Sequence, residues 1–313
     1  MKRFIKSILV FLLLLPLVYI LGVIVWGEVF PQFLKKNLSY KVIGGYTQSR
    51  LHDVKNFKNV DVLVIGPSGA YRGFDPRNFD ARNIKLFNLG SSSQTPIQTE
   101  LLVDKYIDQL NPKLVLYVVN PDIFCDPGIE SMVDLISCNF VDRHHVTVPL
   151  KTYNINVYNT LIYSTYKSLI GGDGYRDEVI TRDKEEKYIS GGFVEKGNNE
   201  FAETTIFPPI PVSIQSDQTQ AFKNILMELN KRKIKVIIIQ PPLVREYYSS
   251  FKMKEIMNRF FKKLGFRYMN FNAGLPFEHK YFYDYGHLNQ SGVDLFNKMV
   301  IDSLEEEEGL VFR

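Results

Sequence analysis

Short apolar runs alternate with longer amphipathic segments over most of the chain. Five runs have the length of buried β-strands and lie at residues 60–65, 84–89, 113–119, 235–240 and 267–271, the last being the least apolar. Apolar positions at helical spacing fill the segments 96–110, 218–232, 253–264 and 290–304. This alternation predicts an α/β fold with a doubly wound, mainly parallel five-stranded sheet.

The interval 121–215 interrupts this alternation. It holds glycine and proline clusters at 171–174, 191–192 and 208–211, and it is too long for an ordinary connection. We interpret it as an insertion after the third strand that lies over the sheet edge as a lid or docking surface. The insertion belongs to an α/β domain over 59–313, and a polar connector over 31–58 precedes that domain.

The N-terminal 30 residues follow a different pattern. Positions 8–26 carry no charge and are rich in Leu, Val and Ile, which suits a bilayer-spanning helix of about 20 residues. A cleaved signal peptide is the alternative, but its apolar region would span only about 7–15 residues and end in small side chains. Three basic residues lie among the first six, and two more stand at 35–36. We expect an uncleaved anchor over 1–30, with the N-terminus cytoplasmic and the rest periplasmic or at the cell surface.

Composition and charge narrow the function further. The net charge is only +4, and no basic block with interleaved aromatics suggests nucleic-acid binding; we interpret the Lys-Arg-Lys run at 231–233 as a solvated helix end. Cys125 and Cys138 could form a disulfide or remain two thiols, and they lack the spacing of a metal site. The chain has neither of the glycine-rich nucleotide motifs, so we expect no metal and no cofactor.

Three candidate residues follow the first three predicted strands. Ser68 lies in a turn between Gly66 and Gly69, where a hydroxyl is exposed and neighbouring N–H groups can bind an oxyanion. The alternative is that Ser68 only caps the next helix. The N–H of Gly90 and the amide of Asn120 are candidate donors to the same oxyanion, because the topology brings these loops to one sheet edge. Otherwise both residues only serve local turns.

Two further candidate residues lie more than two hundred positions after Ser68 in the sequence. Asp284 and His287 stand three residues apart, just before the last predicted helix. At this spacing a single turn can direct both side chains toward one point. His287 would then take the proton of Ser68, and Asp284 would fix the tautomer of the imidazole.

These segments resemble the SGNH (GDSL-type) hydrolase superfamily over about residues 60–120 and 232–304. That family has its serine after the first strand, a glycine after the second, an asparagine after the third and an Asp-x-x-His pair before the last helix. The matching residues here are Ser68, Gly90, Asn120, Asp284 and His287. The resemblance implies an SGNH/flavodoxin-like sheet, with Ser68, Asp284 and His287 catalytic and Ser68, Gly90 and Asn120 forming the oxyanion hole.

The segment 66–76 is more similar to membrane-anchored SGNH proteins that partner membrane-bound O-acyltransferases. Examples are the D-alanyl transfer protein of teichoic-acid modification and the alginate acetylation proteins. The resemblance therefore implies acyl-ester chemistry, with acetyl the expected acyl group, on a cell-surface polysaccharide or cell-wall polymer. It also implies a multi-spanning O-acyltransferase as a partner.

Two departures from the family pattern support an alternative function. Pro67 stands where the family has aspartate, and Asn120-Pro121 replaces the usual Asn-Asp pair. The first hypothesis is an acyltransferase or esterase with a serine nucleophile. The second is a non-catalytic accessory subunit that keeps the fold and docks a membrane-bound O-acyltransferase.

Overall fold

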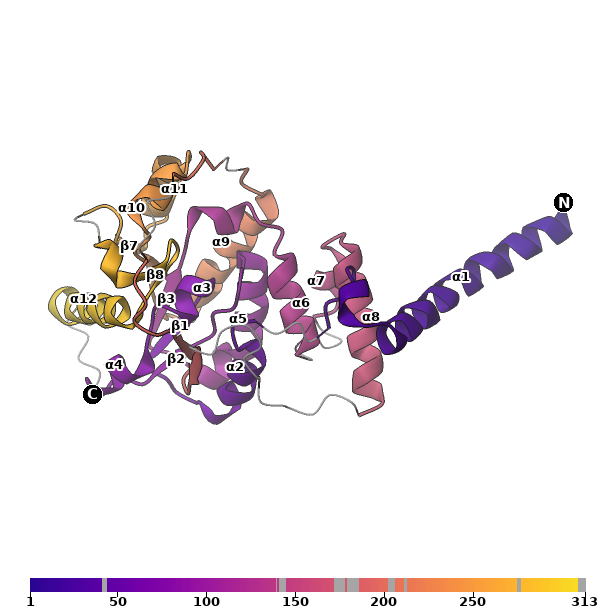
Figure 1. Ribbon diagram of the computed structural model, residues 1–313, viewed down its shortest axis with the longest axis horizontal. Helices are drawn as coiled ribbons and strands as arrows, with labels where there is room; N and C mark the ends of the chain where they lie inside the picture. The colour runs from indigo at the N-terminus through magenta and orange to yellow at the C-terminus, as the bar shows by residue number, and fades with distance from the viewer. Residues whose placement is uncertain are drawn as a thin grey trace. The chain divides into compact units, whose positions relative to one another are not determined.

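The computed structural model describes residues 1–40, 44–138, 140, 145–171, 178, 186–201, 206–210, 213–274 and 277–308. Two compact units make up the chain (Figure 1). One comprises Met1–Val42 and Met132–Arg176, and the other comprises Ile43–Ser131 and Asp177–Arg313. The predicted insertion contributes to both units, and the predicted domain boundaries stay predictions.

A five-stranded, wholly parallel sheet forms the centre of the larger unit. Its order is β2-β1-β3-β6-β7, with bounds Leu86–Asn88, Val62–Ile65, Leu114–Val118, Lys235–Gln240 and Arg267–Asn270. Each strand falls within one of the five predicted runs, so the predicted fold class is confirmed. The order places β1 between β2 and β3, and the three loops that follow these strands are therefore neighbours.

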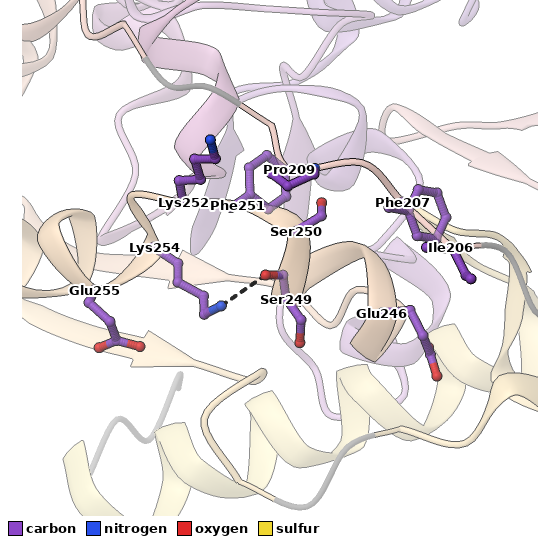
Figure 2. Close-up of a pocket in the computed structure, with 10 residues that line it drawn as sticks. All are labelled: Ile206, Phe207, Pro209, Glu246, Ser249, Ser250, Phe251, Lys252, Lys254 and Glu255. Carbon is purple, nitrogen blue, oxygen red and sulfur yellow. Dashed lines mark hydrogen bonds between the residues drawn. The ribbon is translucent and has the colours of Figure 1, made fainter.

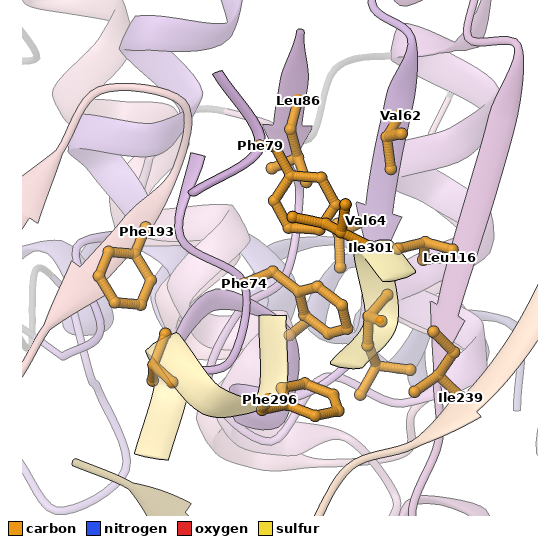
Figure 3. Packing of buried hydrophobic residues seen from close by; sticks show 14 of the residues in the cluster. Val62, Val64, Phe74, Phe79, Leu86, Leu116, Phe193, Ile239, Phe296 and Ile301 are labelled. Atoms are coloured by element: carbon orange, nitrogen blue, oxygen red, sulfur yellow. The ribbon is translucent and has the colours of Figure 1, made fainter. Parts of the chain in front are cut away.

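Helices cover both faces of this sheet, which explains its continuous apolar strands. On one face, Val62, Val64 and Leu116 pack with Phe74 and Phe296 in a buried cluster (Figure 3). On the other face, Tyr117 of β3 lies 4.8 Å, between ring centroids, from Phe222 of α9. Successive residues of a strand thus serve opposite layers, as its two-residue period requires.

The helices that cover the sheet follow the predicted segments closely. They are α5 (Pro96–Leu110), α9 (Ser216–Lys231), α11 (Lys254–Lys263) and α12 (Gln290–Glu308). The start of α5 is set locally, because Thr95 and Gln98 form a capping box and Pro96 occupies the first turn. The Lys-Arg-Lys run does end a helix: Arg232 follows α9 and pairs with Glu228 and Asp108.

Shorter elements complete the larger unit. They are α2 (Thr47–Asp53), η2 (Val54–Asn56), α3 (Ser68–Tyr71), α4 (Pro76–Asp80), η3 (Pro121–Phe124), α10 (Arg245–Ser250), η4 (His279–Tyr281) and the hairpins β4–β5 (Lys187–Ile189, Phe193–Glu195) and β8–β9 (Phe282–Asp284, His287–Leu288). Helix α6 (Ile129–Ser137) runs from this unit into the other. The sequence pattern predicts neither hairpin, since their strands have only two or three residues.

The smaller unit is built around the N-terminal helix α1 (Lys2–Val29). It also contains η1 (Gln32–Leu34), α7 (Thr147–Leu150) and α8 (Ile155–Leu169). The end of α1 packs on α8, where Tyr163 donates to Glu28 at 3.0 Å and its ring covers Gly27. Among the described residues, α1 is the one helix with the length and hydropathy to cross a membrane, as an anchor or as a signal sequence.

The cysteines are thiols in this structure. Neither Cys125 nor Cys138 is joined in a disulfide within the described chain. Cys125 instead directs its Sγ toward the carbonyl of Pro121 at 3.8 Å. Of the two alternatives left open by the sequence, the structure therefore has the thiols.

Candidate active site

The turn after β1 is shaped by a glycine that no other residue can replace without strain. Gly66 has φ 132°, and a Cβ there would lie 2.4 Å from the carbonyl oxygen of Val118. The chain can therefore turn closely over β3 and begin α3 at Ser68. As the first residue of a helix, Ser68 has a backbone N–H without an intrahelical acceptor.

Replacing Gly66 by alanine should distort this turn. The clash with Val118 and the unfavourable φ together predict a loss of about 2–4 kcal/mol in the free energy of unfolding. Urea denaturation of the detergent-solubilised protein measures this loss. Gly274→Ala is the matched control, because no atom lies within 4 Å of its Cβ position, and it should be nearly neutral. Equal urea midpoints for the two variants would show that the turn is not tightly constrained.

Ser68, His287 and Asp284 form a continuous hydrogen-bonded series. The Nε2 atom of His287 lies 2.7 Å from Ser68 Oγ. Its Nδ1 atom lies 2.9 Å from each carboxylate oxygen of Asp284. With Nδ1 protonated and donating to Asp284, Nε2 is free to accept the hydroxyl proton of Ser68.

The β8–β9 hairpin holds the acid and the imidazole in this relation. Asp284 ends β8 and pairs across the hairpin with His287, which begins β9, after an irregularity between Phe282 and Asp284. The N–H of Gly286 donates to Asp284 Oδ1 at 2.8 Å, which fixes the carboxylate. Burial alone would raise the pKa of Asp284. The hydrogen bond and charge of His287, the Gly286 N–H and the charge of Arg72 outweigh it, so the pKa lies below its ordinary value.

Neither a protein-family model nor a curated protein matches the chain. Among solved structures, it is similar to the crystal structure of a protein from Bacteroides fragilis that is proposed to be an acylhydrolase. The sequence identity is 10% and the TM-score is 0.41, over 83% of this chain and 94% of that chain. At this degree of similarity the chemistry of the site follows only from its own residues.

Gly90 and Asn120 lie in the loops on either side of β1. A Cβ on Gly90 would come within 2.7 Å of Ala70, so this loop packs directly on α3. The Gly90 N–H donates to Asn88 Oδ1 at 2.9 Å, and an oxyanion would have to replace that acceptor. Asn120 precedes η3, and its buried Oδ1 has no hydrogen-bond partner among the described residues. Their oxyanion roles stay predictions.

Two charged residues outside the predicted set also lie at this edge. Arg72 lines a narrow hollow together with His287, and it pairs with Glu186 at 2.6 Å. Asp122, in η3, has a buried Oδ1 without a hydrogen-bond partner among the described residues. It lies close enough to His287 for the charge of the imidazolium to act on its carboxylate. The position of Arg72 one helical turn after Ser68 was an available signal, whereas nothing in the sequence indicates the burial of Asp122.

The pKa of Asp122 predicts how stability depends on pH. Burial, helped by the charge of Asp126, raises this pKa from 3.8 to about 6. Between these values the folded protein keeps a proton that the unfolded chain has released, so stability falls as the pH rises through that window. Asp122→Asn should therefore be more stable than the wild type at about pH 7.5, and the difference should vanish near about pH 3.5.

Thermal unfolding of both proteins across this pH range tests the effect. Asp217→Asn is the matched control. Asp217 is exposed in the first turn of α9, where its charge favours the helix, so this variant should gain no stability over the wild type at neutral pH. If Asp122→Asn were no more stable than the wild type at neutral pH, the charge of Asp122 would carry no such cost.

Within the described part of the chain, no group of three or more His, Cys, Asp or Glu side chains is arranged to hold a metal ion. The chemistry that the described site can perform with its own groups is nucleophilic attack by a hydroxyl with an imidazole as base.

Proposed function

We propose that this protein is a membrane-anchored, extracytoplasmic serine acyltransferase or esterase of the SGNH type. It acts on O-acyl groups, acetyl first among them, of a cell-surface polysaccharide or cell-wall polymer. One observation carries the proposal, the series from Ser68 Oγ through His287 to Asp284 at 2.7 and 2.9 Å. These distances are within hydrogen-bonding reach, as general-base activation of a serine requires.

The first half of the reaction forms an acyl-enzyme. Ser68 Oγ attacks the acyl carbonyl while its proton passes to His287 Nε2. The developing oxyanion is held by the Ser68 N–H, the Gly90 N–H and the Asn120 amide. When the ester C–O bond breaks, His287 returns the proton to the departing alkoxide. The acyl group then remains on Ser68.

The second half transfers the acyl group to an acceptor. A hydroxyl of a sugar or polyol, or a water molecule, gives its proton to His287 and attacks the acyl carbon. Cleavage of the Ser68 ester then yields the new ester or the free acid, and His287 reprotonates Ser68. Throughout, Asp284 keeps Nδ1 protonated and stabilises the imidazolium.

The apolar helix α1 supports the proposal of a membrane anchor. It would hold the site close to a lipid-linked or cell-wall substrate and next to a multi-spanning O-acyltransferase partner. Mass spectrometry of the membrane-extracted protein tests whether this helix is retained. Peptides from residues 1–30 should be present. A mature chain that begins beyond residue 26 would show a cleaved signal sequence instead.

A serine-directed fluorophosphonate probe tests the catalytic proposal. The wild-type protein should be labelled at Ser68, and the labelling should be lost in His287→Ala, which removes the base. The control His52→Ala removes an exposed imidazole on α2 and should label like the wild type. Labelling that persists in His287→Ala would contradict the proposed role of the histidine.

A non-catalytic accessory subunit is the second candidate function. It is favoured by the Gly90 N–H, which already has an acceptor in Asn88. A protein of this kind would resist the probe altogether, while Ser68→Ala would leave polymer acylation by the membrane partner unchanged.

A further inference from the structure

A cavity of about 580 Å³ opens in the larger unit (Figure 2). Its walls come from two segments, 206–209 and 246–255. The residues that line it are Ile206, Phe207, Pro209, Glu246, Ser249, Ser250, Phe251, Lys252, Lys254 and Glu255. The volume lies in the range of cavities that hold small ligands.

The walls are held together by backbone as well as side-chain contacts. Ile210 forms an isolated bridge with Phe251, and its N–H donates to the Ser250 carbonyl at 2.9 Å. Lys254 Nζ donates to the Ser249 carbonyl at 3.0 Å (Figure 2). The segment around Phe207 is thus fixed against α10.

A group of three aromatic rings joins this cavity to the catalytic turn. Phe207 lies 5.1 Å from Tyr247 and 5.4 Å from Tyr285, and the two tyrosines are 4.6 Å apart, all between ring centroids. Tyr285 stands directly after Asp284, and its carbonyl accepts from the Val244 N–H at 3.1 Å. A ligand that rests on these rings therefore contacts the residue that directly follows Asp284.

The polar groups of the cavity narrow the class of ligand. Glu246 is exposed at the rim and pairs with His279 at 3.0 Å, and Lys252 and Glu255 also line the space. A pocket for a long acyl chain would bury aliphatic side chains, whereas this one combines aromatic rings with carboxylate, ammonium and hydroxyl groups. Burial raises the pKa of Tyr247, so its phenol stays a protonated hydrogen-bond donor.

We propose that this cavity and the three rings form a subsite for a sugar ring of the glycan on which the enzyme acts. The C–H face of the sugar packs on Phe207 and Tyr285, and its hydroxyls bond to the rim groups. A glycan seated there directs a neighbouring hydroxyl, or its ester, toward Ser68. This role of the cavity rests on the proposed function of the enzyme.

Binding, measured without turnover, tests the subsite. Full-length Ser68→Ala protein in detergent micelles is applied to a spotted array of bacterial polysaccharides. The dissociation constant of the best-bound oligosaccharide is then measured by calorimetry. In this background, Phe207→Ala and Tyr285→Ala should each weaken binding about tenfold, and Tyr285→Phe should keep most of the affinity because it keeps the ring.

Two further variants test the rim of the cavity and control for non-specific effects. Glu246→Gln changes only an exposed rim group and should also weaken binding. Tyr153→Ala removes a ring that is 87% exposed in the other compact unit and should bind like the parent. Thermal unfolding midpoints establish that each variant is folded.

The subsite would be refuted if no polysaccharide bound, or if the ring and rim variants bound as well as the parent. Because the protein lacks Ser68, either result leaves the serine chemistry to be judged separately by the fluorophosphonate probe. Conversely, glycan binding through these residues without probe labelling would support the subsite and contradict the enzyme.

Discussion

Ser68→Ala should lower the turnover of a simple acetyl ester such as 4-nitrophenyl acetate by at least about 10³-fold. Alanine removes the hydroxyl that we propose holds the acyl group, and this small change should leave the short helix α3 and the sheet intact. Initial rates measured with the purified full-length protein give the ratio of kcat values. Ser216→Ala, which removes an exposed hydroxyl at the start of α9, should retain the wild-type rate.

The same assay tests whether Ser68 and His287 act as one unit. The double variant Ser68→Ala with His287→Ala should be no slower than Ser68→Ala alone, since the base has no function without its nucleophile. Full activity in Ser68→Ala would remove the serine from the mechanism. Losses that multiply in the double variant would show that the two residues act independently.

Asp284→Asn should lower kcat by about 10⁴-fold with little change in KM. The asparagine amide can present its NH₂ group to Nδ1, which favours the imidazole tautomer that carries its proton on Nε2. In that tautomer His287 cannot accept the proton of Ser68, although its Nε2 atom still lies close to Ser68 Oγ. The loss therefore falls on the transition state and not on substrate binding.

Steady-state kinetics of Asp284→Asn and of the control Asp217→Asn measure this effect. Asp217 is exposed at the start of α9, so its change to asparagine should leave both constants unaltered. A decrease in kcat of less than tenfold in Asp284→Asn would mean that the hairpin alone orients the imidazole.

The sequence predicted the sheet and its covering helices because their signals are local. Helix α5 has its capping box, its proline in the first turn and, at its end, Asn111 in the left-handed conformation. Strand ends were less well predicted, because hydrophobicity marks burial and not sheet pairing. Ile84 and Leu89 are both buried, yet β2 extends only from Leu86 to Asn88.

The candidate site was predictable in part for a topological reason. Parallel strands end at one edge, so the loops that follow β1, β2 and β3 are neighbours there. The β8–β9 hairpin could not be predicted, because its strands are too short to show a two-residue period. The position of Arg72 depends on Glu186, more than a hundred residues later, and no local pattern connects them.

The three aromatic rings beside the cavity could not be predicted from the sequence either. These rings come from three separate segments, at Phe207, Tyr247 and Tyr285. None of these residues has a distinctive sequence context, and aromatics are frequent in this chain, with 23 Phe and 18 Tyr. Only the folded arrangement distinguishes these three rings from the many that fill the core.

The central claim is that Ser68 carries the acyl group between donor and acceptor. Peptide mass spectrometry of the wild-type protein, quenched in acid during turnover of 4-nitrophenyl acetate, tests it most directly. The proposed mechanism predicts one added acetyl group on the peptide that contains Ser68, and its absence in His287→Ala. Ester turnover without any acetylated Ser68, or with the acetyl group on another residue, would contradict it.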